Sequence, residues 1–409
     1  IVPRACSTSV ENFWYLLTFA NMILFGCLTK EKVGGTVKPN VQHMTPKMAR
    51  RLSMNSSFPV LSANDSVVAG DGTHRNMSMG MMSTASVDPP LAESADFTPL
   101  AGSTTIRINN PTDLPVIDGH VYAGWRRADP TEMLIRSHGY KKTKAKVASP
   151  GDLYECVRSD IFEARTRYPD MASRVKLPKT DFKDEGPKTW NAPNIFVVSI
   201  AIPTDPPKLY GSTENGGGYT VTMYFVMRKE TRDILKRVTA DGYNPSSETV
   251  GDVQKSKINA VRLFDEWCRR APTDDSFMAR FKVVPNAQNL KEIGLPAWIS
   301  KYNGKPFLIK RPGETGFLYR HPDKSCMEFD ISLHPFPYLA KQGICYMKDS
   351  YFKKVLVTFG FLIEGRADDE LPECLIGSMQ LCYPDPMHAI QGEDLFEGKS
   401  PSSIQAEKQ

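Results

Sequence analysis

The segment from Cys326 to Leu381 constrains the fold more than any other part of the sequence. Apolar and polar residues alternate over Met327–Leu333, and this pattern predicts a strand with two unlike faces. A helix is expected next, then the apolar strand Val355–Glu364 and the acidic turn Asp368–Glu373, which leads into a last strand. Strand, helix, strand, turn and strand in this order predict a sheet with helices inserted between its strands.

Periodic apolar segments elsewhere in the chain extend this pattern. Two helices are expected, one over Lys229–Val238 and one with an apolar stripe from Ile258 to Cys268. Because the strands do not alternate regularly with helices, we predict an α+β domain around a mostly antiparallel, curved sheet. The further strands are expected at Met133–Arg136, Ala145–Ala148, Ile195–Ile202, Tyr219–Val226, Phe281–Pro285, Pro306–Lys310 and Gly316–Tyr319.

Residues 1–29 form a separate apolar segment. Its apolar run, Phe13 to Leu28, is shorter than the ~20 residues that a helix needs to span a bilayer. The segment is interpreted as a signal peptide, a short anchor or a helix on a membrane surface, and a gene-model artefact is a fourth alternative. If the segment spans a membrane, the lysines that follow it predict that the rest of the chain lies in the cytosol.

Residues 30–118 are expected to be a disordered linker. They are rich in Ser, Asn, Thr and Gly and poor in aromatic residues, so they cannot bury enough apolar surface to offset chain entropy. Arg50-Arg51-Leu52-Ser53 matches a basophilic kinase site, which makes Ser53 a candidate for phosphorylation. The folded domain is expected over residues 119–388, followed by a flexible tail over 389–409.

The charge distribution and the cysteines indicate which partners and which cellular compartment to expect. Residues 1–118 are neutral, with nine basic and nine acidic residues, so the net charge of +5 lies in the remainder. A diffuse excess suits attraction to anionic membranes, whereas nucleic-acid binding is not expected because it normally requires a dense basic stripe. The eight cysteines show no metal-binding or disulfide spacing and predict buried free thiols in a reducing compartment. We therefore expect a cytoplasmic protein or one bound to the cytosolic side of a membrane, with a single N-terminal anchor as an option.

The densest basic run is Tyr140 to Lys146. On a strand, Lys142, Lys144 and Lys146 would project from one face because side chains alternate. One interpretation is a surface for anionic lipid headgroups, and the alternative is a solvated edge strand that lysines protect from aggregation. The candidate lipid-contact residues are Trp125, Arg126, Arg127, Arg136, Lys141, Lys142, Lys144 and Lys146.

Other polar patterns are interpreted as structural. Glu328, Asp330, Ser332 and His334 share one strand face, which would suit acid–base chemistry or a metal, but we expect that face to lie in water. The Gly211–Gly218 loop precedes a strand and cannot hold a phosphate at a helix N-terminus. The acidic turn is expected to be structural, with partner docking as the alternative. No catalytic residue, metal or cofactor is predicted.

Several of these segments together resemble a known family. Met133-Leu-Ile-Arg, Ile195-Phe-Val-Val-Ser-Ile-Ala-Ile-Pro, Arg280-Phe-Lys-Val-Val-Pro and Glu370-Leu-Pro-Glu occur in the order found in the C-terminal domain of the plant ENHANCED DISEASE RESISTANCE 2 proteins. The resemblance runs from Trp125 to Pro386. Plant members carry pleckstrin-homology and START lipid-transfer domains ahead of this domain, and the 118 residues that precede it here are too few for both. The resemblance implies no catalytic residues.

These observations favour a non-enzymatic, membrane-associated regulatory module that binds a lipid or a membrane-bound partner. The basic run and the location of the excess charge support this expectation. A soluble protein-interaction scaffold and a hydrolase of unrecognised type are the alternatives. Clustered basic residues beside exposed aromatic side chains would favour the membrane module, and a wholly dispersed basic surface would favour the scaffold. A deep pocket containing Glu328, Asp330 and His334 would favour the hydrolase.

Overall fold

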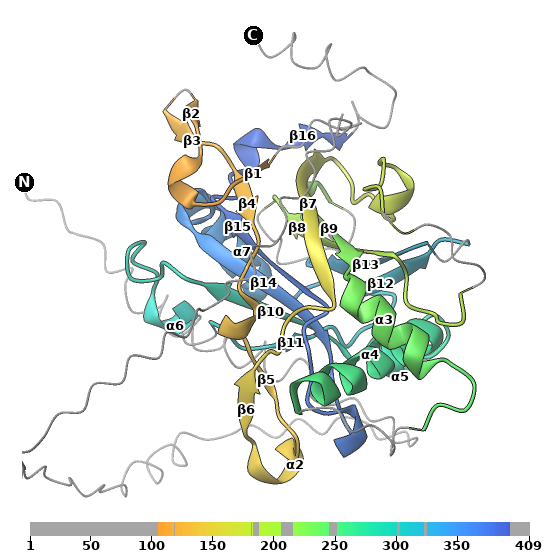
Figure 1. The fold of residues 1–409 in the computed structure, drawn as a ribbon. Coiled ribbons are helices and arrows are strands. Elements are labelled where there is room, and N and C mark those ends of the chain that lie inside the picture. Colours follow the sequence, from red (N-terminus) through yellow and green to blue (C-terminus); the bar gives the residue numbers. More distant parts are fainter. Residues whose placement is uncertain are drawn as a thin grey trace, which may run out of the picture. The chain divides into compact units, whose positions relative to one another are not determined.

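Two six-stranded sheets form the body of the folded region in a computed structural model of the chain (Figure 1). The structure describes residues 105–117, 119–180, 182, 188–205, 216–244, 252–300, 303–322 and 325–392. The predicted α+β class is confirmed, with the strands divided between two sheets. Most neighbouring strands are antiparallel, and the parallel pairs are β1 with β4, β13 with β8 and β16 with β7.

The first sheet, sheet 1, joins segments that are far apart in the sequence. Its central strands come from the C-terminal part of the chain, and one edge comes from the start of the described region. In spatial order its strands are β1 (Ile106–Arg107), β4 (Gly124–Arg126), β15 (Gly377–Cys382), β14 (Leu356–Ile363), β10 (Phe281–Ala287) and β11 (Phe307–Leu308).

The second sheet, sheet 2, contains the strand predicted at Met327–Leu333. In spatial order its strands are β12 (Gly316–Arg320), β13 (Cys326–Ser332), β8 (Ile195–Pro203), β9 (Gly218–Met227), β7 (Tyr154–Ala164) and β16 (Ile390–Gln391). Two small hairpins lie outside both sheets. They consist of β2 (Val116–Ile117) with β3 (His120–Val121), and of β5 (Leu134–Arg136) with β6 (Lys146–Ala148).

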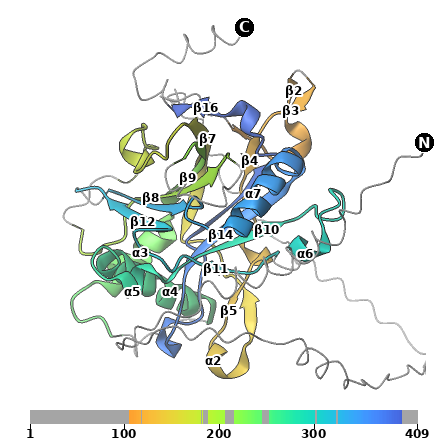
Figure 2. The same ribbon diagram turned by 180° about the vertical axis from the view of Figure 1, so that it is seen from behind.

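The helices connect the strands and cover the junction of the sheets. The helices expected at Lys229–Val238 and along the stripe from Ile258 to Cys268 are confirmed as α3 and α4, and the helix expected after β13 is α7. The view from behind shows α7 beside β14 and β10 (Figure 2). The helices are α2 (Tyr140–Thr143), α3 (Lys229–Val238), α4 (Asp252–Arg270), α5 (Asp275–Met278), α6 (Ala297–Ser300) and α7 (Tyr338–Ser350).

The main core lies between the inner faces of the two sheets. The rings of Phe281 in sheet 1 and Phe329 in sheet 2 stack with centroids 4.1 Å apart. Trp267 of α4 contacts both rings and is fully buried, as expected from the apolar stripe of that helix. The inner face of β13 is apolar as predicted, because Met327, Phe329 and Ile331 enter this core. The cysteines from Cys156 onward are free and buried, as the sequence predicts.

The folded region is longer at both ends than residues 119–388. β1 pairs with β4, and Ile108 and Leu114 are buried against Cys382. At the other end, β16 pairs with β7 beyond residue 388. Truncation at residue 119 would therefore remove an edge strand of sheet 1. The apolar segment 1–29, Ser53, most of the linker and most of the tail lie outside the described residues.

Candidate functional site

The four lysines of the predicted basic surface lie on the hairpin formed by β5, α2 and β6 (Figure 1). The expectation that Lys142, Lys144 and Lys146 share a strand face is wrong. Gly139, with a φ of 65°, leads into the single-turn helix α2, and Lys144 also has a left-handed φ of 57°. The basic run therefore forms the turn of the hairpin, and only Lys146 belongs to a strand.

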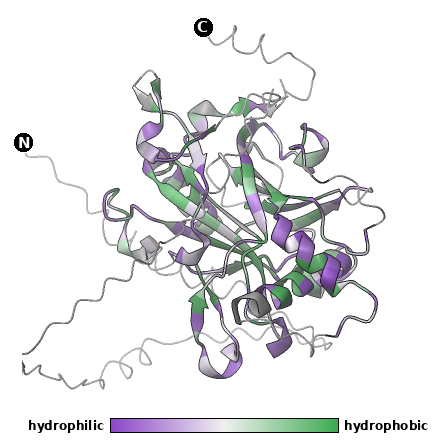
Figure 3. Ribbon diagram, viewed as in Figure 1, coloured by the Kyte–Doolittle hydropathy of each residue, from purple (hydrophilic) through white to green (hydrophobic). Residues whose placement is uncertain are grey.

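The hairpin exposes cationic side chains around its turn and apolar side chains on its strands. Lys141, Lys142, Lys144 and Lys146 are all exposed, and within the described part of the chain none of them forms an ion pair. Lys144 Nζ lies 5.6 Å from the centroid of the Tyr140 ring. Figure 3 shows the hydrophilic tip at α2 next to more hydrophobic strand residues. Two of these strand residues are unusually exposed for their type: Leu134 is 61% exposed and Val147 is 43% exposed.

Strand β5 of this hairpin is fixed to the body by a buried ionic network, the clamp cluster. Its centre is Glu373, whose Oε1 accepts a hydrogen bond from Lys282 Nζ at 2.5 Å. The backbone N–H of Arg136 donates to Glu373 Oε2, and the N–H of Glu373 donates to the Arg136 carbonyl. Strand β5 is thus held by main-chain and side-chain bonds. The members of the clamp cluster are Arg136, Arg280, Lys282, Glu364, Glu370 and Glu373.

The acidic turn supplies Glu370 and Glu373, two of the three carboxylates of the clamp cluster. Glu370 Oε2 accepts hydrogen bonds from Arg280 at 2.5 Å and from the backbone N–H groups of Arg366 and Ala367. Burial opposes ionisation of Glu370, but these bonds lower the pKa of its carboxyl overall. Burial lowers the pKa of Lys282, and the neighbouring Glu373 carboxylate partly offsets this effect. The turn therefore has the structural role that its sequence suggests.

The other candidate lipid-contact residues lie apart from the hairpin tip. Trp125 is only 2% exposed because β4 packs its side chain into the core. Arg126 donates to the Gln380 side chain at 2.6 Å, and Arg127 forms an ion pair with Glu155. Arg136 is partly buried in the clamp cluster. The structure thus brings together the four lysines, but it does not place Trp125 and the three arginines on the same surface.

The polar face of β13 is buried, so the expectation that it lies in water is wrong. Glu328 is 0% exposed and Asp330 is 3% exposed. The chain that follows β7 covers this face. The Ala172 N–H donates to Glu328 Oε2 at 2.6 Å, and Arg167 forms an ion pair with Asp330 at 3.0 Å. This covering segment was missed because its own sequence has little apolar periodicity.

The buried polar groups on this side of sheet 2 form a second network, the carboxyl cluster. Ser199 donates to Glu328 Oε1 at 2.6 Å, and Arg158 pairs with Asp160 at 2.6 Å. Burial, followed by the adjacent Glu328 carboxyl, raises the pKa of Asp330 well above its usual value. Asp330 therefore keeps its proton to a higher pH than an exposed carboxyl group does. The members of the carboxyl cluster are Arg158, Asp160, Arg167, Glu328 and Asp330.

The remaining sequence patterns concern a metal site, a pocket with His334, the glycine-rich loop and a membrane-spanning helix. No group of three or more His, Cys, Asp or Glu residues in the described part of the chain could hold a metal ion. His334 is buried like Glu328 and Asp330, and none of these three residues lines the apolar cavity between the sheets that is described below. Most of the Gly211–Gly218 loop lies outside the described residues. Within them, no helix is long and apolar enough to cross a membrane.

Comparison with known proteins gives one match. A family model described as "Protein ENHANCED DISEASE RESISTANCE 2, C-terminal" matches residues 125–385. This range contains the hairpin, both ionic clusters and most strands of the two sheets. Neither a curated protein nor a solved structure matches the chain.

Proposed function

The chain belongs to the ENHANCED DISEASE RESISTANCE 2 C-terminal family, and we propose that it is a non-enzymatic, membrane-associated regulatory module that binds anionic lipid headgroups through its β5–α2–β6 hairpin. One observation carries the proposal: Lys141, Lys142, Lys144 and Lys146 are all exposed on one projecting hairpin, whose strands also expose Leu134 and Val147. Each lysine near an acidic leaflet contributes about 1 kcal/mol of attraction.

The apolar side chains of the hairpin support a membrane surface as the partner. A basic surface alone would attract any polyanion, and the attraction would be screened by salt. Leu134 and Val147 are exposed on opposite faces of the hairpin, and whichever faces the bilayer can enter the boundary between headgroups and acyl chains, where each buried CH₂ contributes about 0.8 kcal/mol. A soluble protein-interaction scaffold is the alternative, and it requires no such partition into lipid.

The burial of the carboxyl cluster supports a non-enzymatic role. Glu328 and Asp330 were the strongest acid–base candidates in the sequence, and a general acid or base must reach its substrate within hydrogen-bond distance. Arg167 and the chain near Ala172 occupy the space over these carboxyl groups. Their arrangement suits cohesion between a sheet and its covering segment.

Vesicle flotation tests the proposal. The full chain should float with phosphatidylserine-containing vesicles and remain unbound with pure phosphatidylcholine vesicles. Lys141→Glu, Lys142→Glu and Lys144→Glu together should lower the partition coefficient by about a hundredfold, because three attractions of about 1 kcal/mol are lost. Raising the salt concentration should weaken binding of the unmodified chain.

A matched variant controls for net charge. Lys176, Lys229 and Lys291 are also exposed, and they lie outside the hairpin. Their replacement by Glu changes the net charge by the same amount and should leave most of the vesicle binding intact. Equal loss in both triple variants would point to diffuse charge and overturn the hairpin as the contact. Absence of vesicle binding by the unmodified chain would favour the scaffold.

A further inference from the structure

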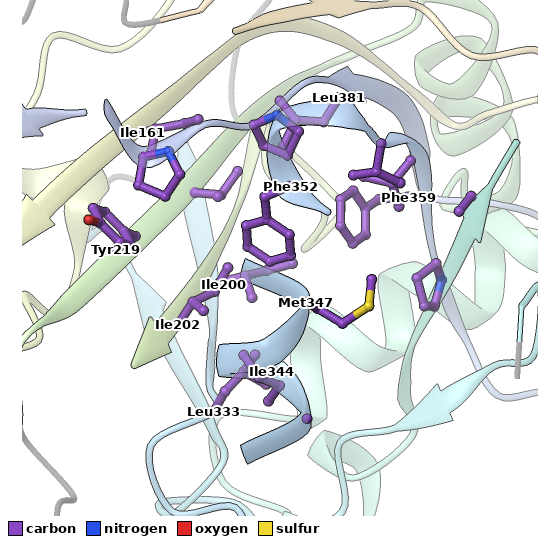
Figure 4. A pocket seen from close by; sticks show the side chains of 18 of the residues that line it. Ile161, Ile200, Ile202, Tyr219, Leu333, Ile344, Met347, Phe352, Phe359 and Leu381 are labelled. Atoms are coloured by element: carbon purple, nitrogen blue, oxygen red, sulfur yellow. The ribbon is translucent and has the colours of Figure 1, made fainter. Parts of the chain in front are cut away.

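An apolar cavity of about 360 Å³ lies between the two sheets beneath α7 (Figure 4). Its volume is within the range of about 300–1,000 Å³ that is typical of small-molecule sites, at the lower end. None of the described residues that line the cavity belongs to the hairpin, the clamp cluster or the carboxyl cluster. Figure 4 shows side chains of both sheets and of α7 around the same space, among them Ile200, Ile202, Ile344, Met347, Phe359 and Leu381.

The interface between the sheets is filled at one end and open at this end. Next to α4, Trp267 and the stacked rings of Phe281 and Phe329 are fully buried. Around the cavity, Phe352 and Phe359 border the same core but remain partly exposed. Since protein interiors are normally close-packed, this end presents apolar surface that the described residues do not cover.

The cavity wall offers no free polar group for recognition. No charged side chain is among the described residues that line it. The Asn303 amide donates to Asn286 and to the Ala287 carbonyl, and its oxygen accepts from the Ala287 N–H at 2.7 Å. Burial and the hydrogen-bonded Glu163 carboxylate raise the pKa of Tyr219 to about 12, so its hydroxyl stays neutral and is already engaged. A sugar or nucleotide would lose its hydrogen bonds to water without replacement.

Two exposed lysines follow the C-terminal end of α7 and lie between residues that line the cavity. Lys353 and Lys354 stand between Phe352 and Val355, both of which line the cavity. Within the described residues neither lysine forms an ion pair, whereas the nearby Asp349 pairs with Lys348 at 3.2 Å. The chain therefore places cationic groups next to an apolar cavity, and a molecule with a hydrocarbon chain and an anionic head complements both.

We propose that this cavity binds the hydrocarbon chain of a fatty acid, with the carboxylate outside near Lys353 and Lys354. Binding a hydrocarbon chain there removes apolar surface of both partners from water, which is favourable and non-directional. The lower-end volume suits one chain. This site goes beyond the proposed membrane docking and does not depend on it.

Titration with cis-parinaric acid, a fluorescent fatty acid, tests the proposal in the absence of vesicles. The unmodified chain should bind it saturably, with one site. Met347→Trp fills the cavity from α7 and should raise Kd by about tenfold or more. Tyr346→Trp is the matched control, because Tyr346 is on the same helix but is 44% exposed, and its Kd should stay near that of the unmodified chain.

Three further measurements separate the possible outcomes. Val357→Phe fills the cavity from sheet 1 and should also weaken binding, while thermal unfolding shows whether each variant is folded. Lys353→Glu with Lys354→Glu should weaken cis-parinaric acid binding more than binding of zwitterionic lysophosphatidylcholine. The hairpin triple variant should bind the fatty acid normally even where it fails to float with vesicles.

No saturable binding by the unmodified chain, or equal affinity of folded Met347→Trp and Tyr346→Trp proteins, would overturn the cavity site. An equal effect of the Lys353/Lys354 variant on both lipids would overturn the placement of the fatty-acid carboxylate near these two lysines.

Discussion

The clamp cluster and the carboxyl cluster both remove charged side chains from water, but they contain different balances of charge. In the clamp cluster three cationic groups face three carboxylates, with Lys282 and Glu373 at its centre. In the carboxyl cluster, Arg158 and Arg167 face three acidic groups. The second cluster therefore has one carboxyl group too many for its cations.

This difference explains why the pKa values move in opposite directions. In the clamp cluster the pKa values of Glu364 and Glu370 are lowered, because hydrogen bonds and cations outweigh burial. In the carboxyl cluster the pKa of Asp330 is raised, because burial and Glu328 outweigh Arg167. A buried network can thus be neutralised by opposite charge or by a retained proton, and the two solutions respond differently to substitution.

The largest effect is expected from Lys282→Met. Removal of the cation leaves the buried Glu373 carboxylate without its closest partner, and such a change costs about 3–5 kcal/mol in unfolding free energy. Chemical denaturation of the single variant measures the loss. Lys282→Met combined with Glu373→Gln removes both charges, keeps an amide oxygen for the N–H groups that Glu373 holds, and should recover much of it. If the single variant matches the unmodified protein in stability, the clamp cluster does not fix β5.

Arg167→Met should have an intermediate effect. The hydrogen bond that Arg167 donates to Asp330 is lost, but the remaining carboxyl group can hold its proton and stay neutral. The hydrogen bond to a charged donor contributes about 1.5–3 kcal/mol, and Met retains part of the packing of Arg167 over the Phe317 ring. Denaturation should show a smaller loss than for Lys282→Met. A loss of equal size would mean that Asp330 is ionised at neutral pH.

The smallest effect is expected from Asp330→Asn, because an amide resembles the protonated carboxyl group. At pH 5 the cost should stay below about 1 kcal/mol. The folded-state pKa of Asp330 is raised, so its contribution to stability is complete below its unfolded-state pKa and declines as the pH rises toward the folded-state value. The unmodified protein should therefore lose stability relative to Asp330→Asn between pH 5 and pH 8.

Denaturation of both proteins across this pH range measures whether the unmodified protein loses stability relative to Asp330→Asn as the pH rises. The other groups that face Asp330 are Glu328, Arg167 and Tyr319, and they are unchanged in the variant. A stability difference that grows in favour of the unmodified protein as the pH rises would show that Asp330 is a stabilised carboxylate. In that case the two clusters would neutralise their carboxyl groups in the same way.

Local periodicity predicted the elements well because it depends on nearby residues. The apolar stripe ending at Cys268 became α4, and the alternation over Met327–Leu333 became β13. The longest strand, β7, was missed because Arg158, Ser159 and Asp160 interrupt its apolar pattern. These three residues are buried in the structure, so their polarity gave the wrong signal about their surroundings.

Tertiary features could not be predicted in the same way. The alternation of Glu328 and Asp330 with apolar residues is the pattern of a wet strand face, and only the covering chain near Ala172 shows otherwise. The residues around the cavity, such as Ile200 and Phe359, read as ordinary core residues. Whether the space between them is filled depends on how two sheets and α7 meet, which the sequence does not specify locally.

The bonds between Glu373 and Arg136 have a consequence for orientation. A hairpin joined to its domain by a flexible loop could hold a membrane while the domain tumbles freely. Here the β5 backbone is bonded in both directions to the turn that enters β15, so the hairpin cannot pivot without breaking buried ion pairs. Attachment through the lysines would therefore limit the angles that the two sheets adopt above the bilayer. Every other surface of the domain would then face the membrane or the solvent in a restricted orientation.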